Sequence, residues 1–150
     1  MGYRLDVVAG SVVDALQQAG GLMCDRSMAG WTVTVRTDDI SHRQALLILG
    51  AEIRAFEQPA AASETSQTVV AQADRPPEEA ARVGLQPVKH RLSSAARAFK
   101  AHALRAAGLD SCVEASETLW VSDDPDPDRV LGRHLRCLAV DNLVGECPGG

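Results

Sequence analysis

The sequence has few aromatic residues, few lysines and no long apolar run. Aromatic side chains make up 3% of the 150 residues, so a hydrophobic core has to be built from Ala, Val, Leu and Ile. The hydrophobic fraction of 45% is sufficient for one domain, or for two small lobes that share one core. The basic residues are 13 Arg and 2 Lys, and together with abundant Ala and Asp this usage indicates a bacterial source.

No apolar run reaches the roughly 18 residues that a membrane span requires. Residues 1–20 are interrupted by Asp6 and Asp14, which excludes the apolar core of a secretory signal there. We therefore expect a cytoplasmic protein that does not bind membranes. No C-x-x-C pair occurs among the four cysteines, which we expect to be free thiols in a reducing compartment: Cys24, Cys112, Cys137 and Cys147.

Hydrophobic periodicity predicts a first lobe over residues 1–56, built as helix, strand and helix, and the YRLDVV stretch near its start can add a strand. Ser11 is placed as the N-cap of the first helix, and Gly20-Gly21 is expected to weaken or end that helix. The strand is WTVTV, residues 31–35, in which apolar residues alternate with threonine. The second helix is expected after an aspartate pair, with apolar residues at helical spacing: Ile40, Leu46, Leu47, Leu49 and Ile53.

Residues 57–81 are poor in large apolar groups and rich in Ala, Gln, Ser, Thr, Glu and Pro. A segment of this composition buries too little apolar surface to offset the entropy that it would lose on ordering. We therefore predict a flexible linker between the first lobe and a second lobe over residues 82–150.

The second lobe repeats the order helix, strand, helix and ends in a short tail. Its first helix stops at Gly108 and is expected to bury one apolar face, made of Leu92, Ala96, Phe99, Ala103 and Ala106. A strand is predicted at ETLWV, residues 117–121. The last helix is expected to carry Val130, Leu131, Leu135 and Leu138.

Both lobes place an aspartate pair between the strand and the helix that follows it. We therefore predict a small two-layer α/β domain built from two similar helix–strand–helix halves. A single strand per half leaves unpaired edges, so the strands are expected to pair between lobes or between subunits. Homodimerisation is a natural extension of this prediction.

The aspartate pairs are Asp38-Asp39 and Asp123-Asp124. A strand that ends in two aspartates and leads into a helix resembles the start of response-regulator receiver domains, in which an acidic pair holds magnesium. After Asp124 only 26 residues follow, too few for the rest of a receiver. Carboxylates at the start of a helix are explained by the free N–H groups that they cap. A metal-dependent enzyme that uses these aspartates is kept as an alternative.

The sequence contains no nucleophile elbow, Walker loop or H-E-x-x-H helix. His42 and His134 each follow an aspartate pair and are the candidates for an acid or a base, although a surface position explains both. His134 and Cys137 could share a zinc ion with Cys112 and Cys147, but their irregular spacing favours packing instead. We assign no catalytic residue, no metal ligand and no cofactor.

The strongest charge signal is a basic segment without acidic residues, between Glu79 and Asp110. The net charge of the whole chain is −5, so a segment that carries only positive charges is unusual in it. The six cations of the segment are Arg82, Lys89, Arg91, Arg97, Lys100 and Arg105. On a helical wheel the cations of the helix lie opposite its apolar residues, so the helix is expected to present a basic surface.

Three explanations fit this basic helix: an acidic protein partner, nucleic acid, or contact with acidic turns of the protein itself. The acidic pI of 5.3 and the absence of a nucleic-acid-binding motif favour protein over nucleic acid. We therefore predict a non-enzymatic interaction or regulatory module that binds a protein partner and self-associates. The predicted contact residues are Arg91, Arg97, Lys100 and Arg105, and a nucleic-acid-binding regulator that uses residues 82–105 is the alternative.

Overall fold

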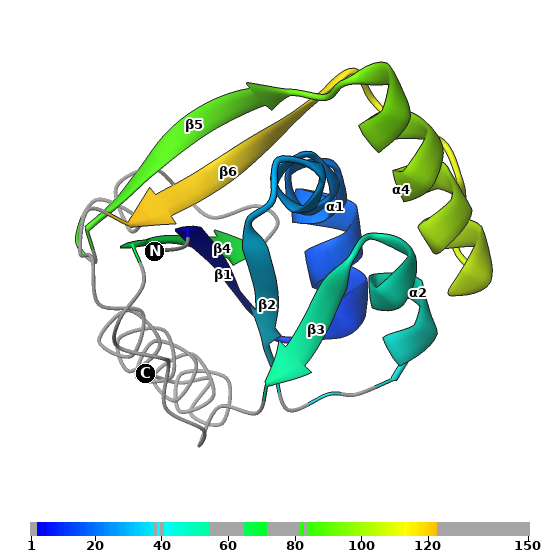
Figure 1. Ribbon diagram of the computed structural model, residues 1–150, viewed down its shortest axis with the longest axis horizontal. Coiled ribbons are helices and arrows are strands. Elements are labelled where there is room, and N and C mark those ends of the chain that lie inside the picture. The colour runs from blue at the N-terminus through cyan, green and yellow to red at the C-terminus, as the bar shows by residue number, and fades with distance from the viewer. Residues whose placement is uncertain are drawn as a thin grey trace, which may run out of the picture.

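A six-stranded mixed sheet organises the protein (Figure 1). The computed structural model describes residues 3–37, 39, 41–54, 65–71, 82 and 84–122. The strand order is β3-β2-β1-β4-β6-β5; the first four are parallel neighbours, and β6 runs antiparallel to both β4 and β5. The strands are β1 (Tyr3–Ala9), β2 (Thr32–Arg36), β3 (Ala51–Arg54), β4 (Thr65–Ala71), β5 (Leu85–Arg91) and β6 (Ser116–Ser122). The predicted α/β class is confirmed.

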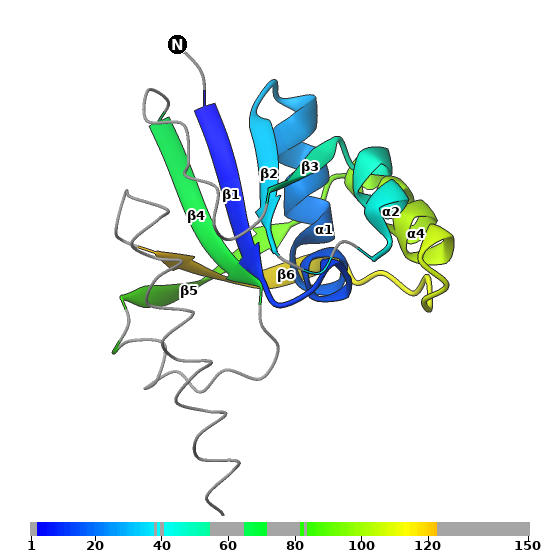
Figure 2. The ribbon, with the colours of Figure 1, turned by 90° about the horizontal axis from the view of Figure 1, so that it is seen from below.

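The described helices pack on one face of the sheet (Figure 2). Alternate residues of β1, namely Leu5, Val7 and Ala9, point toward this face and are fully buried. The aliphatic core predicted from the shortage of aromatics therefore lies between the sheet and three helices. These helices are α1 (Val12–Met28), α2 (Arg43–Ile48) and α4 (Ser94–Ala106). None of the described helices combines the length and the apolar character that crossing a bilayer requires.

Two residues of β1 are charged and are nevertheless buried. Arg4 and Asp6 are 5% and 1% exposed, and Arg4 Nε lies 2.8 Å from Asp6 Oδ2. Because side chains alternate between the two faces of a strand, this ion pair lies on the face opposite the helices. The buried charges account for the mixed polar and apolar sequence of β1.

Residues 65–71 correct the linker prediction over this range, because they form β4. This strand pairs in parallel with β1 along its whole length, from Tyr3–Thr65 to Ala9–Ala71. Val69, Val70 and Ala71 are buried. A short run of small and β-branched residues in a polar segment can form a central strand because neighbouring strands and helices supply the burial that the segment itself lacks.

Strands from both predicted lobes belong to this one sheet. The connection is made where β4 pairs with β6, at Val69–Val121 and Val70–Trp120. The strands of the two predicted lobes therefore share one sheet without pairing directly, because β4, from the segment predicted as a linker, lies between them. The division into two similar halves remains a prediction, since the second copy of the motif extends past Ser122, outside the described residues.

The helix predicted after the first aspartate pair is shorter than expected. Helix α2 ends at Ile48, and Gly50, at φ +77°, turns the chain into β3. Ile53 pairs with Val35 of β2 and is therefore a strand residue. A spacing of four residues suits both a helix and an alternating strand, and the left-handed glycine decides between them.

The predicted apolar face of α4 is partly wrong. Ala96 and Ala103 are fully buried, but Phe99 is 45% exposed, and Ala106 is exposed as well. Lys100, predicted to lie on the solvent face, is 6% exposed. The helix is therefore rotated, relative to the predicted orientation, toward a polar contact that the periodicity did not include.

Both edges of the sheet have features that disfavour further strand pairing. At one edge β3 has four residues. At the other edge β5 contains Pro87, which has no backbone N–H, and the exposed Lys89. A dimer of this protein would therefore use a surface other than an extended sheet.

Gly21 allows close approach of Leu92, which precedes α4. A Cβ atom at Gly21 would overlap the side chain of Leu92, which is 6% exposed. We expect Gly21→Ala to lower the free energy of unfolding by about 1–3 kcal/mol, measured by urea denaturation. The double variant Gly21→Ala/Leu92→Ala should lose less than the sum of the single losses, because removing the leucine makes room for the methyl group. Additive losses would contradict this contact.

Candidate functional site

The four predicted contact residues divide into two groups. Arg91 is the last residue of β5, Arg97 and Arg105 lie on α4, and all three are exposed. Lys100 is buried and is not part of this surface. Protein or nucleic-acid binding through the three arginines remains a prediction, whereas Lys100 has a different role.

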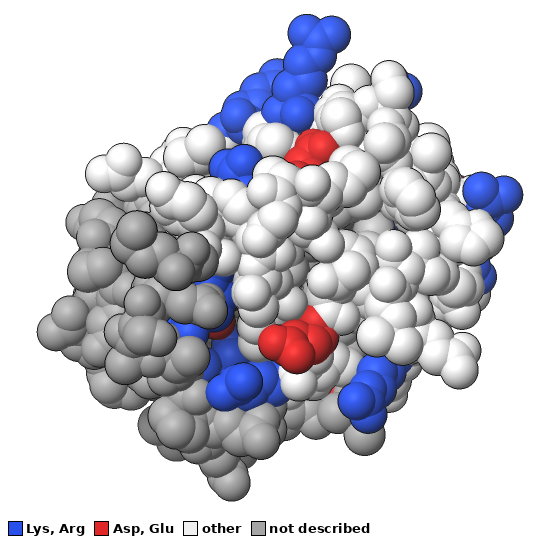
Figure 3. Space-filling view, viewed as in Figure 1, with Lys and Arg blue, Asp and Glu red and all other residues white. Residues whose placement is uncertain are grey.

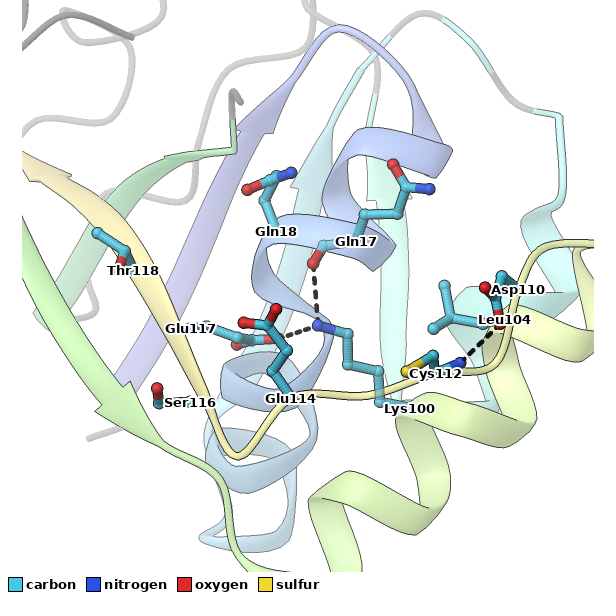
Figure 4. A pocket seen from close by; sticks show the side chains of 10 residues that line it. All are labelled: Gln17, Gln18, Lys100, Leu104, Asp110, Cys112, Glu114, Ser116, Glu117 and Thr118. Carbon is cyan, nitrogen blue, oxygen red and sulfur yellow. Dashed lines mark hydrogen bonds and ion pairs between the residues drawn. The ribbon is translucent and has the colours of Figure 1, made fainter. Parts of the chain in front are cut away.

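Lys100 forms a buried ion pair with Glu117 of β6. The distance from Lys100 Nζ to Glu117 Oε2 is 2.7 Å, and the two side chains are 8% and 4% exposed. Lys100 Nζ also donates a hydrogen bond to the backbone oxygen of Gln17 in α1, at 2.9 Å (Figure 4). The ammonium group thus joins α4 to both β6 and α1.

The carboxylate of Glu117 accepts two hydrogen bonds from the middle of α1. The backbone N–H groups of Gly21 and Leu22 donate to its two oxygens, at 2.7 and 2.9 Å. In a regular α-helix these N–H groups would donate to the carbonyl oxygens of Gln17 and Gln18. The Lys–Glu pair therefore inserts into the hydrogen-bond ladder of α1, and Figure 2 shows the helix bending within its length.

The bend explains the glycine pair that we expected to weaken the first helix. The helix continues to Met28, so Gly20-Gly21 bends it without ending it. A Cβ atom at Gly20 would lie 3.2 Å from Lys100 Cγ, so the lysine stem passes directly over this position. Two adjacent positions without side chains let Lys100 and Glu117 reach the backbone of α1.

A second polar cluster fixes the C-terminal half of α1 to the start of α4. Asp25 Oδ2 lies 2.9 Å from His90 Nε2, and Asp25 Oδ1 accepts a hydrogen bond of 2.5 Å from Ser93 Oγ. Ser93 is also the N-cap of α4, where its hydroxyl oxygen accepts from the N–H of Ala96 at 3.0 Å. One carboxylate thus positions both β5 and the first turn of α4.

The geometry of Asp25, His90 and Ser93 differs from that of a catalytic triad. In a triad the histidine lies between the nucleophile and the carboxylate, so that it can accept the hydroxyl proton. Here the carboxylate lies between the other two side chains. The cluster therefore positions elements of the fold and does not activate Ser93.

The surroundings of Asp25 and Cys24 shift their pKa values in opposite directions. Partial burial would raise the pKa of Asp25, but hydrogen bonds from Ser93 and His90 outweigh it and lower the pKa below its ordinary value. Burial, assisted by the negative charge of Asp25, raises the pKa of the Cys24 thiol. Cys24 is thus a buried, protonated thiol at neutral pH, as expected for a core cysteine.

Of the aspartates considered as metal ligands, the structure describes Asp39. It is exposed, and its Oδ1 accepts a 3.0 Å hydrogen bond from the N–H of Ser41. Hydrogen bonds from the backbone and the side chain of Ser41 lower its pKa. Asp38, Asp123 and Asp124 lie outside the described residues. Within the described ranges, no three His, Cys, Asp or Glu side chains are arranged to hold a metal ion.

The histidine and cysteine candidates are not brought together in the part of the chain that the structure describes. His42 precedes α2 in a left-handed conformation, at φ 64°, and its exposed side chain makes no capping hydrogen bond. Cys112 is exposed. His134, Cys137 and Cys147 lie outside the described residues, so the zinc alternative stays untested.

The strand order reverses between β1 and β4, which is where open α/β sheets commonly bind ligands. After β1 the chain continues through Gly10 and Ser11 into the buried Val12. The hydroxyl oxygen of Ser11 accepts from the N–H of Asp14 at 3.2 Å, which confirms the predicted N-cap. The hydroxyl at this switch point therefore serves to start α1.

Sequence reasoning missed both polar clusters because their members are far apart in the chain. Glu117 and Gly21 are separated by 96 residues, and His90 and Asp25 by 65. One signal was present in the sequence. Lys100 follows Ala96 by four residues, so it shares the apolar face of its helix, and a lysine there requires a buried acceptor.

We predict that Lys100→Met lowers the free energy of unfolding by about 3–5 kcal/mol, because it leaves the buried carboxylate of Glu117 without its counterion. Urea denaturation measures the loss. Lys89→Met, at an exposed position of β5, is the matched control and should change stability by about 0.5 kcal/mol or less. Equal losses in the two variants would contradict the proposed importance of the ion pair.

The lowered pKa of Asp25 predicts a stability loss in acid. As the pH falls below about 4, the unfolded chain protonates this aspartate before the folded protein does, so folding becomes less favourable. The stabilisation that the contacts of Asp25 provide is fully present above the pKa that Asp25 has in the unfolded chain. It is lost as the pH falls through the lower pKa that Asp25 has in the folded protein. Asp25→Asn should be less stable than the wild type at pH about 6 and should lose less stability by pH about 3. If the urea midpoints of the wild type and Asp25→Asn fell by the same amount between these two pH values, the lowered pKa of Asp25 would be refuted.

Comparisons with known proteins support the fold alone. No family model matches the chain, and no curated protein matches it. Among solved structures, the crystal structure of the antimicrobial reagent A40926 pseudoaglycone deacetylase Dbv21 is similar, with a TM-score of 0.50 and 13% identity. The match covers 79% of this chain and 96% of the other. The chain therefore shares an α/β arrangement with this deacetylase.

Proposed function

We propose that the protein is a non-enzymatic interaction module that binds an acidic protein partner. The contact is a basic surface, defined here as Lys89 and Arg91 of β5 with Arg97 and Arg105 of α4. All four side chains are exposed, and none forms an ion pair with a described acidic residue. This contrast with Lys100, which is buried and ion-paired with Glu117, is the observation that carries the proposal.

The arrangement of the four cations favours an extended contact. Lys89 and Arg91 are two residues apart in a strand and so lie on the same face of β5. Figure 3 shows positive side chains along the upper rim of the molecule, where Figure 1 places β5. Because an exposed ion pair contributes about 0.2–1 kcal/mol, several such contacts together would be needed for specific binding.

A protein partner fits better than nucleic acid. The net charge of −5 opposes at long range the approach of any polyanion, and a nucleic acid is negative along its whole length, whereas a protein partner can confine its acidic residues to one local surface. The similar deacetylase supports no catalytic proposal, because 13% identity carries no information about the site.

The proposal includes a cytoplasmic location and self-association. Pro87 and Lys89 disfavour pairing of β5 between subunits, so a dimer would bury exposed apolar side chains instead. Tyr3, Met28, Leu47 and Phe99 are each at least 45% exposed and supply such surface. Light scattering at micromolar concentration tests the dimer, and a monomer there would remove this part of the proposal.

Charge reversal tests the basic surface. Arg97→Glu should weaken binding of a labelled polyglutamate peptide two- to fivefold in fluorescence anisotropy, and Lys89→Glu/Arg91→Glu/Arg97→Glu should abolish it. Binding to the wild type should weaken as salt increases. Arg43→Glu, an exposed arginine on α2 that changes the net charge equally, is the matched control and should bind as the wild type does.

A labelled single-stranded oligonucleotide of equal length separates the two partner classes. The proposal predicts weaker binding of the oligonucleotide than of the peptide. Tighter oligonucleotide binding would move the assignment to nucleic acid. Equal effects of Arg43→Glu and Arg97→Glu would show that net charge, and not this surface, drives the interaction, and would overturn the proposal.

A further inference from the structure

A polar cavity of about 470 Å³ lies between α1, α4 and the segment that leads into β6 (Figure 4). This volume falls in the range of about 300–1,000 Å³ that is typical of small-molecule sites. The cavity is separate from the four cations of the basic surface, none of which lines it. It therefore offers a binding function independent of a protein partner.

The floor and the rim of the cavity differ in exposure. Lys100 and Glu117 line it and are buried, so they form its floor. Asp110, Glu114 and Thr118 also line it and are exposed, so they form its rim. A ligand can enter past the rim and reach the ion pair that holds the bend of α1.

The lining has an excess of negative charge. One lysine faces three carboxylates, and Lys100 already neutralises Glu117. Asp110 and Glu114 form no ion pair with a described residue; Asp110 Oδ1 accepts a 3.1 Å hydrogen bond from the N–H of Cys112. Two carboxylates at the rim are thus available to a positively charged ligand.

The floor provides a hydrogen-bond donor. A lysine ammonium group has three N–H donors, and the contacts of Lys100 Nζ with Gln17 and Glu117 account for two of them. The third can donate to a ligand oxygen. Because Glu117 already supplies the counterion, a neutral oxygen such as a hydroxyl suits this position better than a second carboxylate.

The walls add donors and acceptors and little apolar surface. Gln17 and Gln18 of α1 contribute amides, whereas the side chains of Ser116 and Thr118 lie on the face of β6 opposite Glu117 (Figure 4). Leu104 is the one aliphatic side chain among the lining residues that the structure describes. An apolar molecule would gain little here, whereas a polyhydroxylated one can satisfy these groups.

We propose that this cavity binds a small hydroxylated amine, that is, an amino polyol or amino alcohol. The ammonium group of the ligand binds one of the two rim carboxylates, Asp110 or Glu114. A hydroxyl oxygen accepts from Lys100 at the floor, and further hydroxyl groups bind the amides of Gln17 and Gln18.

The test compares glucamine with sorbitol, a matched pair that differs in having an amine or a hydroxyl at one end. Titration into ¹⁵N-labelled protein should give saturable amide shifts at residues 110–118 and at Gln17 and Gln18, with a Kd of about 1 mM for glucamine. Sorbitol should bind at least about fivefold more weakly, because it lacks the charge. Equal affinities, or glucamine shifts elsewhere in the protein, would overturn the proposal.

Variants at the rim test the assigned carboxylates without disturbing the core. Asp110→Asn/Glu114→Gln should reduce glucamine affinity about fivefold or more and leave that of sorbitol unchanged. Both positions are exposed, and the asparagine keeps an oxygen for the N–H of Cys112. Glu52→Gln, at an exposed position of β3, is the control for Glu114→Gln and should bind glucamine as the wild type does. A loss in the control, or none in the double variant, would contradict the site.

Discussion

The ion pair between Lys100 and Glu117 is the interaction on which the arrangement of α1, α4 and β6 depends. It supplies partners for the N–H groups of Gly21 and Leu22 and for the carbonyl oxygen of Gln17, so these three backbone groups stay hydrogen-bonded where the helix bends. Each charge is expensive to bury alone, and each is compensated by the other and by the backbone of α1. Removing either side chain would therefore leave buried polar groups without partners and would weaken the contacts among α1, α4 and β6 together.

This constraint matters because the ladder between β4 and β6 is short. It consists of the pairs Val69–Val121 and Val70–Trp120, whereas β5 and β6 pair over seven residues. The β5–β6 ribbon is therefore also attached to the rest of the protein through side-chain contacts with α1 and α4. Asp25 supplies the second attachment, since it binds His90 of the ribbon and Ser93 at the start of α4.

The same geometry separates the surfaces available for binding. Burial of Lys100 turns one cation of the basic segment into a structural group and leaves the exposed arginines to face solvent. The bend of α1 and the segment before β6 enclose a cavity whose floor is the ion pair itself. An outer basic surface and a polar cavity with excess negative charge thus result from one packing arrangement, and they suit ligands of opposite charge.

The sequence by itself determined the α/β class, the N-cap at Ser11, the strands around Val33 and Leu119 and the existence of α4, because these follow from local periodicity and capping. Only the tertiary structure decided that residues 65–71 form a central strand, that Lys100 is buried and that Gly20-Gly21 bends a helix without ending it. Burial by distant neighbours can order a polar segment, and a buried charge depends on a partner whose position in the chain carries no local signal. Periodicity describes which face of an element is apolar, but the contacts of that face are set by residues up to 96 positions away.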